Sequence, residues 1–253
     1  MARAIAGRTD TVHAKFTFSA VSGAFAMSDG TTALRTDPSG CTPEVYHRSL
    51  MSLVLASQSP RRAELLAAAG IVFTARAANV DEQVLPGELP DGHVRRLARA
   101  KAQAIAADMP DVVVLGADTV VVVDGEILGK PRDGEDARRM LALLSGRRHE
   151  VFTGVAVACQ GRVVDTVEVS TVDFAPLTPA EIGWYVASGE PLDKAGAYAI
   201  QGLASRFVTR IAGSYSNIVG MPVAQTCALL AKAGHNLSLG PGGGGDGLGG
   251  SRH

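Results

Sequence analysis

Hydrophobic and polar positions follow two regular periods between about residue 51 and residue 235. Short apolar runs bounded by Gly, Pro or Asp are typical of buried strands, and longer stretches with an apolar residue every three or four positions are typical of helices. The pattern predicts strands at 53–56, 112–115, 120–123, 126–128, 151–158, 163–174, 197–201 and 206–211. It predicts helices at 60–69, 92–107, 134–144 and 222–233, and one that begins at Pro179 and ends by Gly189.

The connections between these elements carry residues that favour turns and helix ends. Asp124-Gly125 separates two apolar runs, which indicates a β-hairpin, and Gln160-Gly161 lies in the same way between two longer runs. Thr178 and Glu181 have the spacing of a capping box, and Ser59 and Asp133 each have the position of a helix N-cap. Because hairpins and helical crossovers alternate, we expect an α/β fold with a mixed sheet.

The two ends of the chain lack this patterning. Residues 1–50 show no sustained period, and we expect either a disordered extension or an upstream start codon chosen wrongly. Residues 236–253 contain a glycine-rich run and are expected to form a flexible tail. The working domain is therefore expected at 51–235.

Composition narrows the class of protein. Of 253 residues, 46% are hydrophobic and 19% are charged, and the net charge is −1, so there is no general attraction for nucleic acid or for an anionic membrane. The longest apolar run falls short of the 18 or so residues of a membrane span, and 16–27 is too weakly apolar for a signal peptide. The three cysteines are scattered without zinc spacing, which favours a reducing compartment, the cytoplasm.

Candidate chemistry begins with Ser57-Gln58-Ser59-Pro60-Arg61-Arg62, where a strand turns into a helix. Free backbone N–H groups at a helix start favour anions, and Arg61 and Arg62 add fork-shaped donors for phosphate. Arginines at this position oppose the helix dipole, which suggests that they face a ligand. The alternative is a pair of solvated arginines without a partner.

Asp118 and Lys101 are the next candidates. Gly116-Ala117-Asp118-Thr119 lies between two apolar strands, which suits a general base or a metal ligand held rigidly by the backbone, although a turn-capping aspartate has the same pattern. Helical spacing places Lys101 within the apolar stripe of 92–107. Such a lysine pairs with a carboxylate, faces a cleft or snorkels at the edge of the stripe.

Two further motifs complete the set of charged candidates. Gly129-Lys130-Pro131 is a rigid corner that can aim one ammonium group at a phosphate, without the spacing of a Walker loop. Asp81-Glu82 is an acidic pair that either helps to hold a divalent metal or forms an exposed loop. Several cations, three carboxylates and the lack of a nucleophile–His–Asp set together fit the hydrolysis of a polyphosphate.

Six motifs, in this order along 51–233, resemble the Maf family. They are SQSPRR at 57–62, GADTVV at 116–121, LGKP at 128–131, LSGRRHEVFTG at 144–154, DKAGAYAIQG at 193–202 and GSYSNIVGMP at 213–222. The resemblance implies a Maf/inosine-triphosphatase-like fold, an elongated mixed sheet with a central cleft between two lobes, usually as a homodimer. It also implies a pyrophosphatase that cleaves between the α and β phosphates of a nucleotide with a divalent cation, Mg²⁺, Mn²⁺ or Co²⁺.

The resemblance also implies roles for individual residues. The family's proton acceptor falls on Asp118, and its acidic position on Asp81 and Glu82, which with Asp118 make the expected metal ligands. Its phosphate-binding residues fall on Ser57, Arg61, Arg62, Lys101 and Lys130. Its positions for base preference fall on Arg61, Thr119 and Gln201, whose identities resemble the subclass that hydrolyses dTTP and UTP.

Two other functions are compatible with the same sequence. The first is a nucleotide-binding regulator of septum formation, in which hydrolysis is incidental; an intact base and phosphate-binding lysines argue against it. The second is a house-cleaning pyrophosphatase for purine nucleotides such as inosine triphosphate. Turnover of a panel of nucleotides distinguishes all three.

Overall fold

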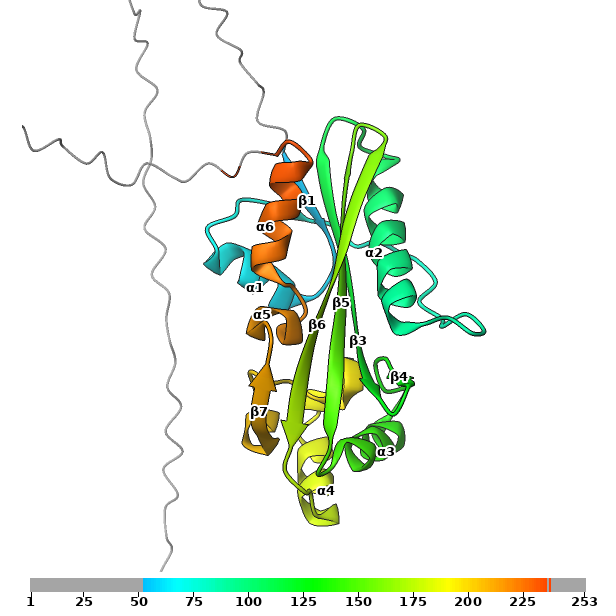
Figure 1. Ribbon diagram of the computed structural model, residues 1–253, viewed down its shortest axis with the longest axis vertical. Coiled ribbons are helices and arrows are strands. Elements are labelled where there is room, and N and C mark those ends of the chain that lie inside the picture. Colours follow the sequence, from blue (N-terminus) through cyan, green and yellow to red (C-terminus); the bar gives the residue numbers. More distant parts are fainter. Residues whose placement is uncertain (1–51, 236, 238–253) are drawn as a thin grey trace, which may run out of the picture. The chain divides into compact units, whose positions relative to one another are not determined.

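The computed structural model describes residues 52–235 and 237 of the chain. The expectations for residues 1–50, and for the tail apart from Leu237, lie outside the described residues. Within them, seven strands form one mixed sheet of order β2-β1-β3-β5-β6-β7, with β4 paired to β3 (Figure 1), which confirms the expected α/β class. The strands are β1 Leu53–Ala56, β2 Thr74–Ala75, β3 Val113–Val123, β4 Glu126–Leu128, β5 Arg148–Cys159, β6 Arg162–Phe174 and β7 Val208–Ala212.

The sheet combines a parallel part and an antiparallel part. Strand β1 runs parallel to β2 and β3, whereas β3, β5, β6 and β7 follow one another antiparallel. Both expected hairpin turns are confirmed, because Asp124 and Gly125 (φ 50° and 81°) and Gln160 and Gly161 (φ 49° and 75°) all have positive φ. Positive φ at both central residues matches the twist of the flanking strands.

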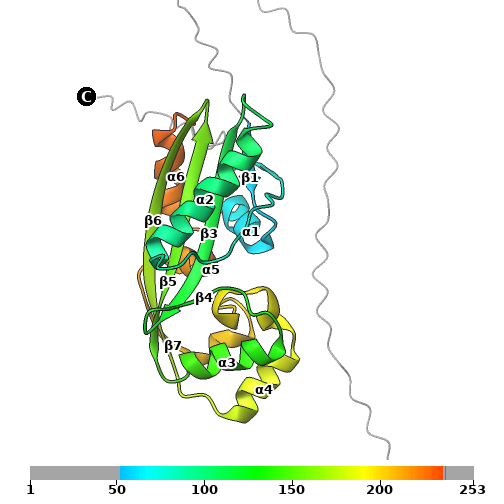
Figure 2. The ribbon, with the colours of Figure 1, turned by 90° about the vertical axis from the view of Figure 1, so that its right-hand side faces the viewer.

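Helices cover both faces of the sheet. Helix α2 (Pro90–Ala106) lies on one face, and α1 (Pro60–Ala68), α5 (Tyr215–Val219) and α6 (Val223–Lys232) lie on the other (Figures 1 and 2). Alternate residues of β1 therefore enter different cores: Leu53 and Leu55 pack with α1 and α6, and Val54 and Ala56 pack with α2. This two-sided burial explains why β1 is a continuous apolar run.

A third core lies at the far ends of β3, β5 and β6. Helices α3 (Gly134–Leu144) and α4 (Pro179–Ala187) and the 3-10 turns η1 (Glu190–Asp193), η2 (Ala195–Ala197) and η3 (Leu203–Phe207) surround it. Two of the predicted caps are confirmed: Asp136 N donates to the Asp133 side chain, and Thr178 and Glu181 form the reciprocal capping box.

The prediction of two strands around Asp118 is wrong, because β3 continues through it as one strand of 11 residues. Gly116 makes this possible. A Cβ atom there would lie 2.3 Å from the Ala98 carbonyl oxygen of α2, so only glycine lets the strand pass beneath the helix without a break. Asp118 is consequently fixed by strand pairing on β5, opposite Gly154, and does not cap a turn.

Other details also differ from the predicted pattern. The segment 197–201 is not a strand, because Gly196 and Ala197 have positive φ (66° and 58°) and turn the chain against Val121. Ser59 has the N-cap position of α1, yet its side chain makes no capping hydrogen bond. Helix α5 was not predicted, since its five residues are too few to display a helical period.

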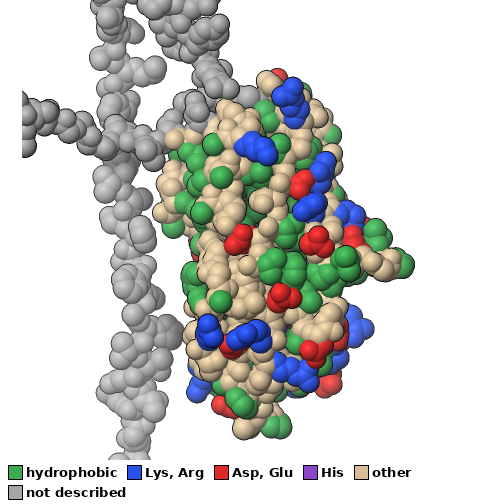
Figure 3. All heavy atoms as spheres, in the orientation of Figure 1, with side chains coloured by type: hydrophobic (Ala, Val, Ile, Leu, Met, Phe, Trp, Pro, Cys, Tyr) green, Lys and Arg blue, Asp and Glu red, His purple; other side chains and the backbone are tan. Residues whose placement is uncertain are grey.

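Charged side chains are interspersed on the surface of the described residues. The face in Figure 3 carries both basic and acidic groups, without a broad field of one sign. Among the helices of the described part of the chain, none is long and apolar enough to cross a membrane.

Candidate active site

A cavity of about 680 Å³ opens where the parallel strand β1 ends. Residues 113–116 of β3 pair with β1, and residues 121–123 of β3 pair with β4. Residues 117–120 lie between these two paired segments. Asp118 and Thr119 line the cavity from this interval. Ser57 and the start of α1 line it from the end of β1, the position at which open α/β sheets bind ligands.

Lys101 of α2 joins two carboxylates in the cavity. Its Nζ lies 2.6 Å from Oδ1 of Asp118 and 2.5 Å from Oε1 of Glu82. The side chains of Lys101 and Asp118 are only 8% and 9% exposed. Of the alternatives for Lys101, pairing with carboxylates in a cleft is therefore the one observed. The position of Lys101 depends on Gly154 of β5, where a Cβ atom would lie 2.3 Å from the Val94 carbonyl oxygen of α2.

Glu82 is held in the site by its own loop. Burial would raise the pKa of its carboxyl group, but the hydrogen bond and charge of Lys101, with the charge of Lys130, hold that pKa below its ordinary value. Glu88 fastens the loop to α2: its carboxylate accepts from Arg96 at 2.6 Å and contacts Nδ1 of His93 at 2.9 Å. Arg96 lowers the pKa of Glu88 far below its usual range. The pairing of Glu88 with Arg96 is not predictable from the sequence, because a spacing of eight residues matches no local helical motif.

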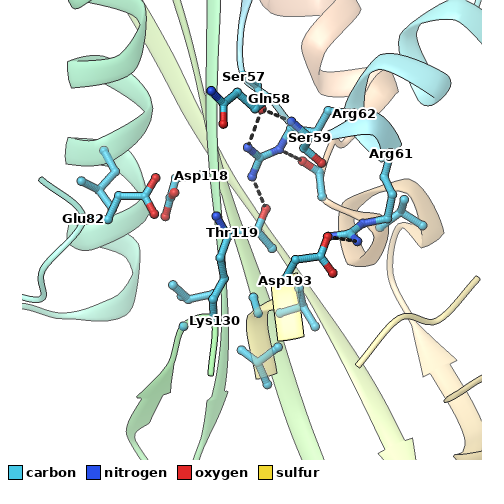
Figure 4. A pocket seen from close by; sticks show the side chains of 18 of the residues that line it. Ser57, Gln58, Ser59, Arg61, Arg62, Glu82, Asp118, Thr119, Lys130 and Asp193 are labelled. Carbon is cyan, nitrogen blue, oxygen red and sulfur yellow. Dashed lines mark hydrogen bonds and ion pairs between the residues drawn. The ribbon is translucent and has the colours of Figure 1, made fainter. Parts of the chain in front are cut away.

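Arg62 is fixed from three directions on the opposite side of the cavity (Figure 4). Its Nε donates to Gly220 O at 2.8 Å, Nη1 to Ser57 Oγ at 3.2 Å and Nη2 to Thr119 Oγ1 at 3.0 Å. Burial lowers the pKa of the Arg62 guanidinium, and the nearby Asp118 charge partly opposes this effect. The alternative of a solvated arginine without a partner is therefore wrong for Arg62.

Arg61 and Lys130 line the same cavity with fewer restraints. Nη1 of Arg61 lies 3.9 Å from a carboxylate oxygen of Asp193, which faces it from η1 (Figure 4). Asp193 also forms an ion pair with Lys194. Arg61 and Lys130 together with Arg62 and Lys101 give the cavity four cations, against the carboxylates of Glu82, Asp118 and Asp193.

Gln201 lines the cavity from a turn that Glu190 and Tyr185 hold. Glu190 accepts from Tyr185 Oη at 2.8 Å and from Leu203 N at 3.0 Å, and Tyr185 Oη accepts from Ala199 N at 3.1 Å. Neither Glu190 nor Tyr185 is predictable from the sequence, because their contacts with Leu203 and Ala199 depend on the turn between η2 and η3. The sequence pattern predicts a strand at this turn.

The structure brings all but one of the candidate side chains together. Ser57, Arg61, Arg62, Glu82, Lys101, Asp118, Thr119, Lys130 and Gln201 line the cavity. Asp81 does not: it is exposed, and its Oδ1 accepts from Gln83 N at 3.0 Å, which is the exposed-loop alternative for this residue. Two carboxylates, Glu82 and Asp118, thus share the site with Lys101.

A mixed α/β sheet with a cationic cavity at a strand end defines a class of anion-binding α/β enzymes, and comparison with known proteins narrows it. Residues 52–233 match the family of Maf-like proteins, and the chain belongs to this family.

Several proteins similar to this chain are named dTTP/UTP pyrophosphatase. The dTTP/UTP pyrophosphatase of Anaeromyxobacter dehalogenans (strain 2CP-C) is 58% identical over 73% of this chain and 95% of its own. That of Myxococcus xanthus is 54% identical over 72% of this chain and 92% of its own. Among solved structures, the Staphylococcus aureus Ham1 protein has a TM-score of 0.39 and 14% identity over 62% of this chain and 90% of its own, a similarity too slight to define the fold.

Proposed function

We propose that this chain is a pyrophosphatase that hydrolyses dTTP and UTP to the nucleoside monophosphate and pyrophosphate. The observation that carries the proposal is the buried contact of Lys101 with Asp118, joined by Glu82 and opposite Arg62, in one cavity. Preorganised cations of this kind neutralise charge on a transferring phosphoryl group. The names of the relatives, which match this chain over nearly their whole length, support the choice of dTTP and UTP.

In the proposed reaction, a water oxygen attacks the α-phosphorus, and the bond from the α-phosphorus to the bridging oxygen breaks. Pyrophosphate carries away the electron pair of that bond. Lys101 occupies Oδ1 of Asp118, so we assign the water's proton to Oδ2. Arg61, Arg62 and Lys130, with Lys101, hold the phosphate chain in line, and Ser57 contributes by fixing Arg62.

The residues also fit a divalent cation. Within the described residues, no group of three His, Cys, Asp or Glu side chains gathers to hold a metal alone. Glu82 and Asp118 meet at one ammonium group, however, and Mg²⁺ is commonly bound by one or two carboxylates together with substrate phosphates and waters. We propose that these two carboxylates hold Mg²⁺, Mn²⁺ or Co²⁺ when the nucleotide is present. Such an ion would neutralise charge on the phosphates.

The decisive experiment is product analysis on a nucleotide panel with each metal. We expect pyrophosphate and dTMP or UMP from dTTP and UTP, and much slower turnover of inosine triphosphate and dCTP. Asp118→Asn should abolish turnover, whereas the control Asp91→Asn, on the exposed start of α2, should not change it. Tight nucleotide binding by the wild type with negligible turnover would instead support the regulator of septum formation.

We propose further that the catalytic domain is 51–235, that it is a homodimer, and that it works in the cytoplasm. The family match to 52–233 supports the domain bounds. A chain starting at Met51, assayed beside the full chain, should have equal kcat/KM. Sedimentation of both chains tests the dimer.

A further inference from the structure

Thr119 takes part in a chain of hydroxyl groups that leads away from the cavity. Its Oγ1 lies 3.0 Å from Oγ1 of Thr153, the residue paired with it across β3 and β5. Oγ1 of Thr153 in turn lies 3.1 Å from the carbonyl oxygen of Asn217 in α5. Thr153 and Asn217 are fully buried, so water does not compete for the hydrogen bond between them.

The protons along this chain have a single consistent order. A carbonyl oxygen only accepts, so Thr153 must donate its one hydroxyl proton to Asn217. The proton between the two threonines therefore belongs to Thr119. Arg62 only donates, so Thr119 accepts from Nη2. The order runs from Arg62 to Thr119 to Thr153 to the carbonyl of Asn217.

This order leaves Thr119 without a proton to donate to a nucleotide. Its effect on the substrate must then pass largely through the guanidinium of Arg62. Gly220, the C-cap residue of the same short helix, supplies the carbonyl oxygen that accepts from Arg62 Nε. Both ends of the Arg62 guanidinium are thus anchored to α5 or its C-cap, one directly through Gly220 and one through Thr119 and Thr153.

Arg62 retains two N–H groups for a ligand. Of the five guanidinium donors, three go to Gly220, Ser57 and Thr119, and one remains on each terminal nitrogen. A free arginine side chain has several rotatable bonds, so holding the guanidinium in one plane removes an entropy cost from phosphate binding.

We infer that Thr153 is a positioning residue, which orients the phosphate-binding guanidinium of Arg62 through the hydroxyl of Thr119. The inference rests on the proposed function for its substrate. Thr153 does not line the cavity, so its effect on a bound nucleotide is indirect. Its hydroxyl matters because it directs the Thr119 proton away from Arg62, which leaves a Thr119 lone pair for Nη2.

Two substitutions separate the hydroxyl of Thr153 from its packing. Thr153→Val keeps the shape and removes the hydroxyl, and Thr153→Ser keeps the hydroxyl and removes a methyl group. We expect Thr153→Val to lower kcat/KM for dTTP about tenfold, mainly by raising KM, and Thr153→Ser to stay within about twofold of the wild type. Urea midpoints establish that each variant is folded under the assay conditions.

A double-mutant cycle with Arg62→Met then tests whether Thr153 acts through Arg62. In the Arg62→Met background, Thr153→Val should change kcat/KM less than about twofold, because the group that it positions is gone. Equal losses in both backgrounds, or equal losses from the Val and Ser variants, would overturn the inference. If the wild type releases no pyrophosphate from any nucleotide, the proposed function fails; the same cycle on the dissociation constant of pyrophosphate still decides the role of Thr153.

Discussion

The Nζ atom of Lys101 lies 2.6 Å from Oδ1 of Asp118, and both side chains are more than nine-tenths buried. A buried ion pair of this kind is costly to break, because removal of one partner leaves an uncompensated charge away from water. In this chain the same ammonium group also contacts Glu82 at 2.5 Å. Two carboxylates therefore depend on one cation.

Lys101→Met should consequently affect both stability and turnover. We expect the free energy of unfolding to fall by about 3–5 kcal/mol and kcat/KM to fall at least about 100-fold. Lys232→Met, on the exposed last turn of α6, is the matched control and should change each quantity little. Urea unfolding measures the first effect. If the double variant Lys101→Met/Asp118→Asn regains stability, the loss in Lys101→Met is due to the unpaired carboxylate of Asp118. If the double variant regains none, the unpaired carboxylate is not the cause.

Lys101 also shows what local sequence can predict. Its place in the apolar stripe of α2 follows from helical period alone, which limits it to pairing with a carboxylate, facing a cleft or snorkelling. Asp118 was identified for its apolar surroundings, although β3 continues through it. The β-hairpins and capped helices were predictable for the same reason, because each depends on residues close together in the chain.

The unpredicted parts of the site depend on contacts that are distant in sequence. Thr153 meets Thr119 only because β3 and β5 pair in one register, and register is set by the whole sheet. Glu190 holds Leu203 across a turn in which Gly196 lies against Val121 of β3. No local period marks either residue.

Gly154→Ala should displace α2. Its Cβ atom would lie 2.3 Å from the Val94 carbonyl oxygen and 2.9 Å from Arg95 N, both backbone atoms that cannot rotate away. We expect the free energy of unfolding to fall by about 3 kcal/mol and turnover to fall with it, since Lys101 moves with the helix. Gly183→Ala in α4 is the contrasting variant: nothing lies near its Cβ, and alanine should stabilise that helix by about 1 kcal/mol. Thermal and urea unfolding measure the change in unfolding free energy of both variants. A change of the same sign in Gly154→Ala and Gly183→Ala would contradict the prediction.

His149 should make stability depend on pH. It is 1% exposed, its Nε2 lies 3.0 Å from Tyr198 Oη, and burial lowers its pKa to about 4. As the pH falls, His149 is therefore protonated near pH 6.5 in the unfolded chain and only near pH 4 in the folded chain. The free energy of unfolding is highest above pH 6.5 and decreases as the pH falls from 6.5 toward 4.

The loss between pH 7 and pH 5 should be about 2 kcal/mol larger in the wild type than in His149→Gln, which lacks the titrating ring. The comparison is made on the difference in unfolding free energy at each pH. His235 is kept in both proteins, so that its contribution cancels. Parallel pH profiles for the two proteins would show that His149 does not carry the effect.

Glu190 should control base selectivity by shaping the turn that carries Gln201. Its two carboxylate oxygens accept from Tyr185, Leu203 and Ala204, and a Cβ atom at Gly202 would lie 2.3 Å from Oε2. Glu190→Gln replaces one acceptor oxygen by an N–H donor, so at least one of these bonds is lost. The turn should then loosen at the side of the cavity that we expect to face the base.

We expect Glu190→Gln to lower the preference for dTTP over dCTP, as a ratio of kcat/KM, about tenfold. The inhibition constant of pyrophosphate should stay within about twofold, because Arg62 and Lys101 are untouched. Gly202→Ala should reproduce the loss of preference by displacing the Glu190 carboxylate, and Glu135→Gln, on the exposed surface of α3, should not. An equal fall in turnover of dTTP and dCTP would mean that Glu190 supports the fold of this region without directing Gln201 toward the base.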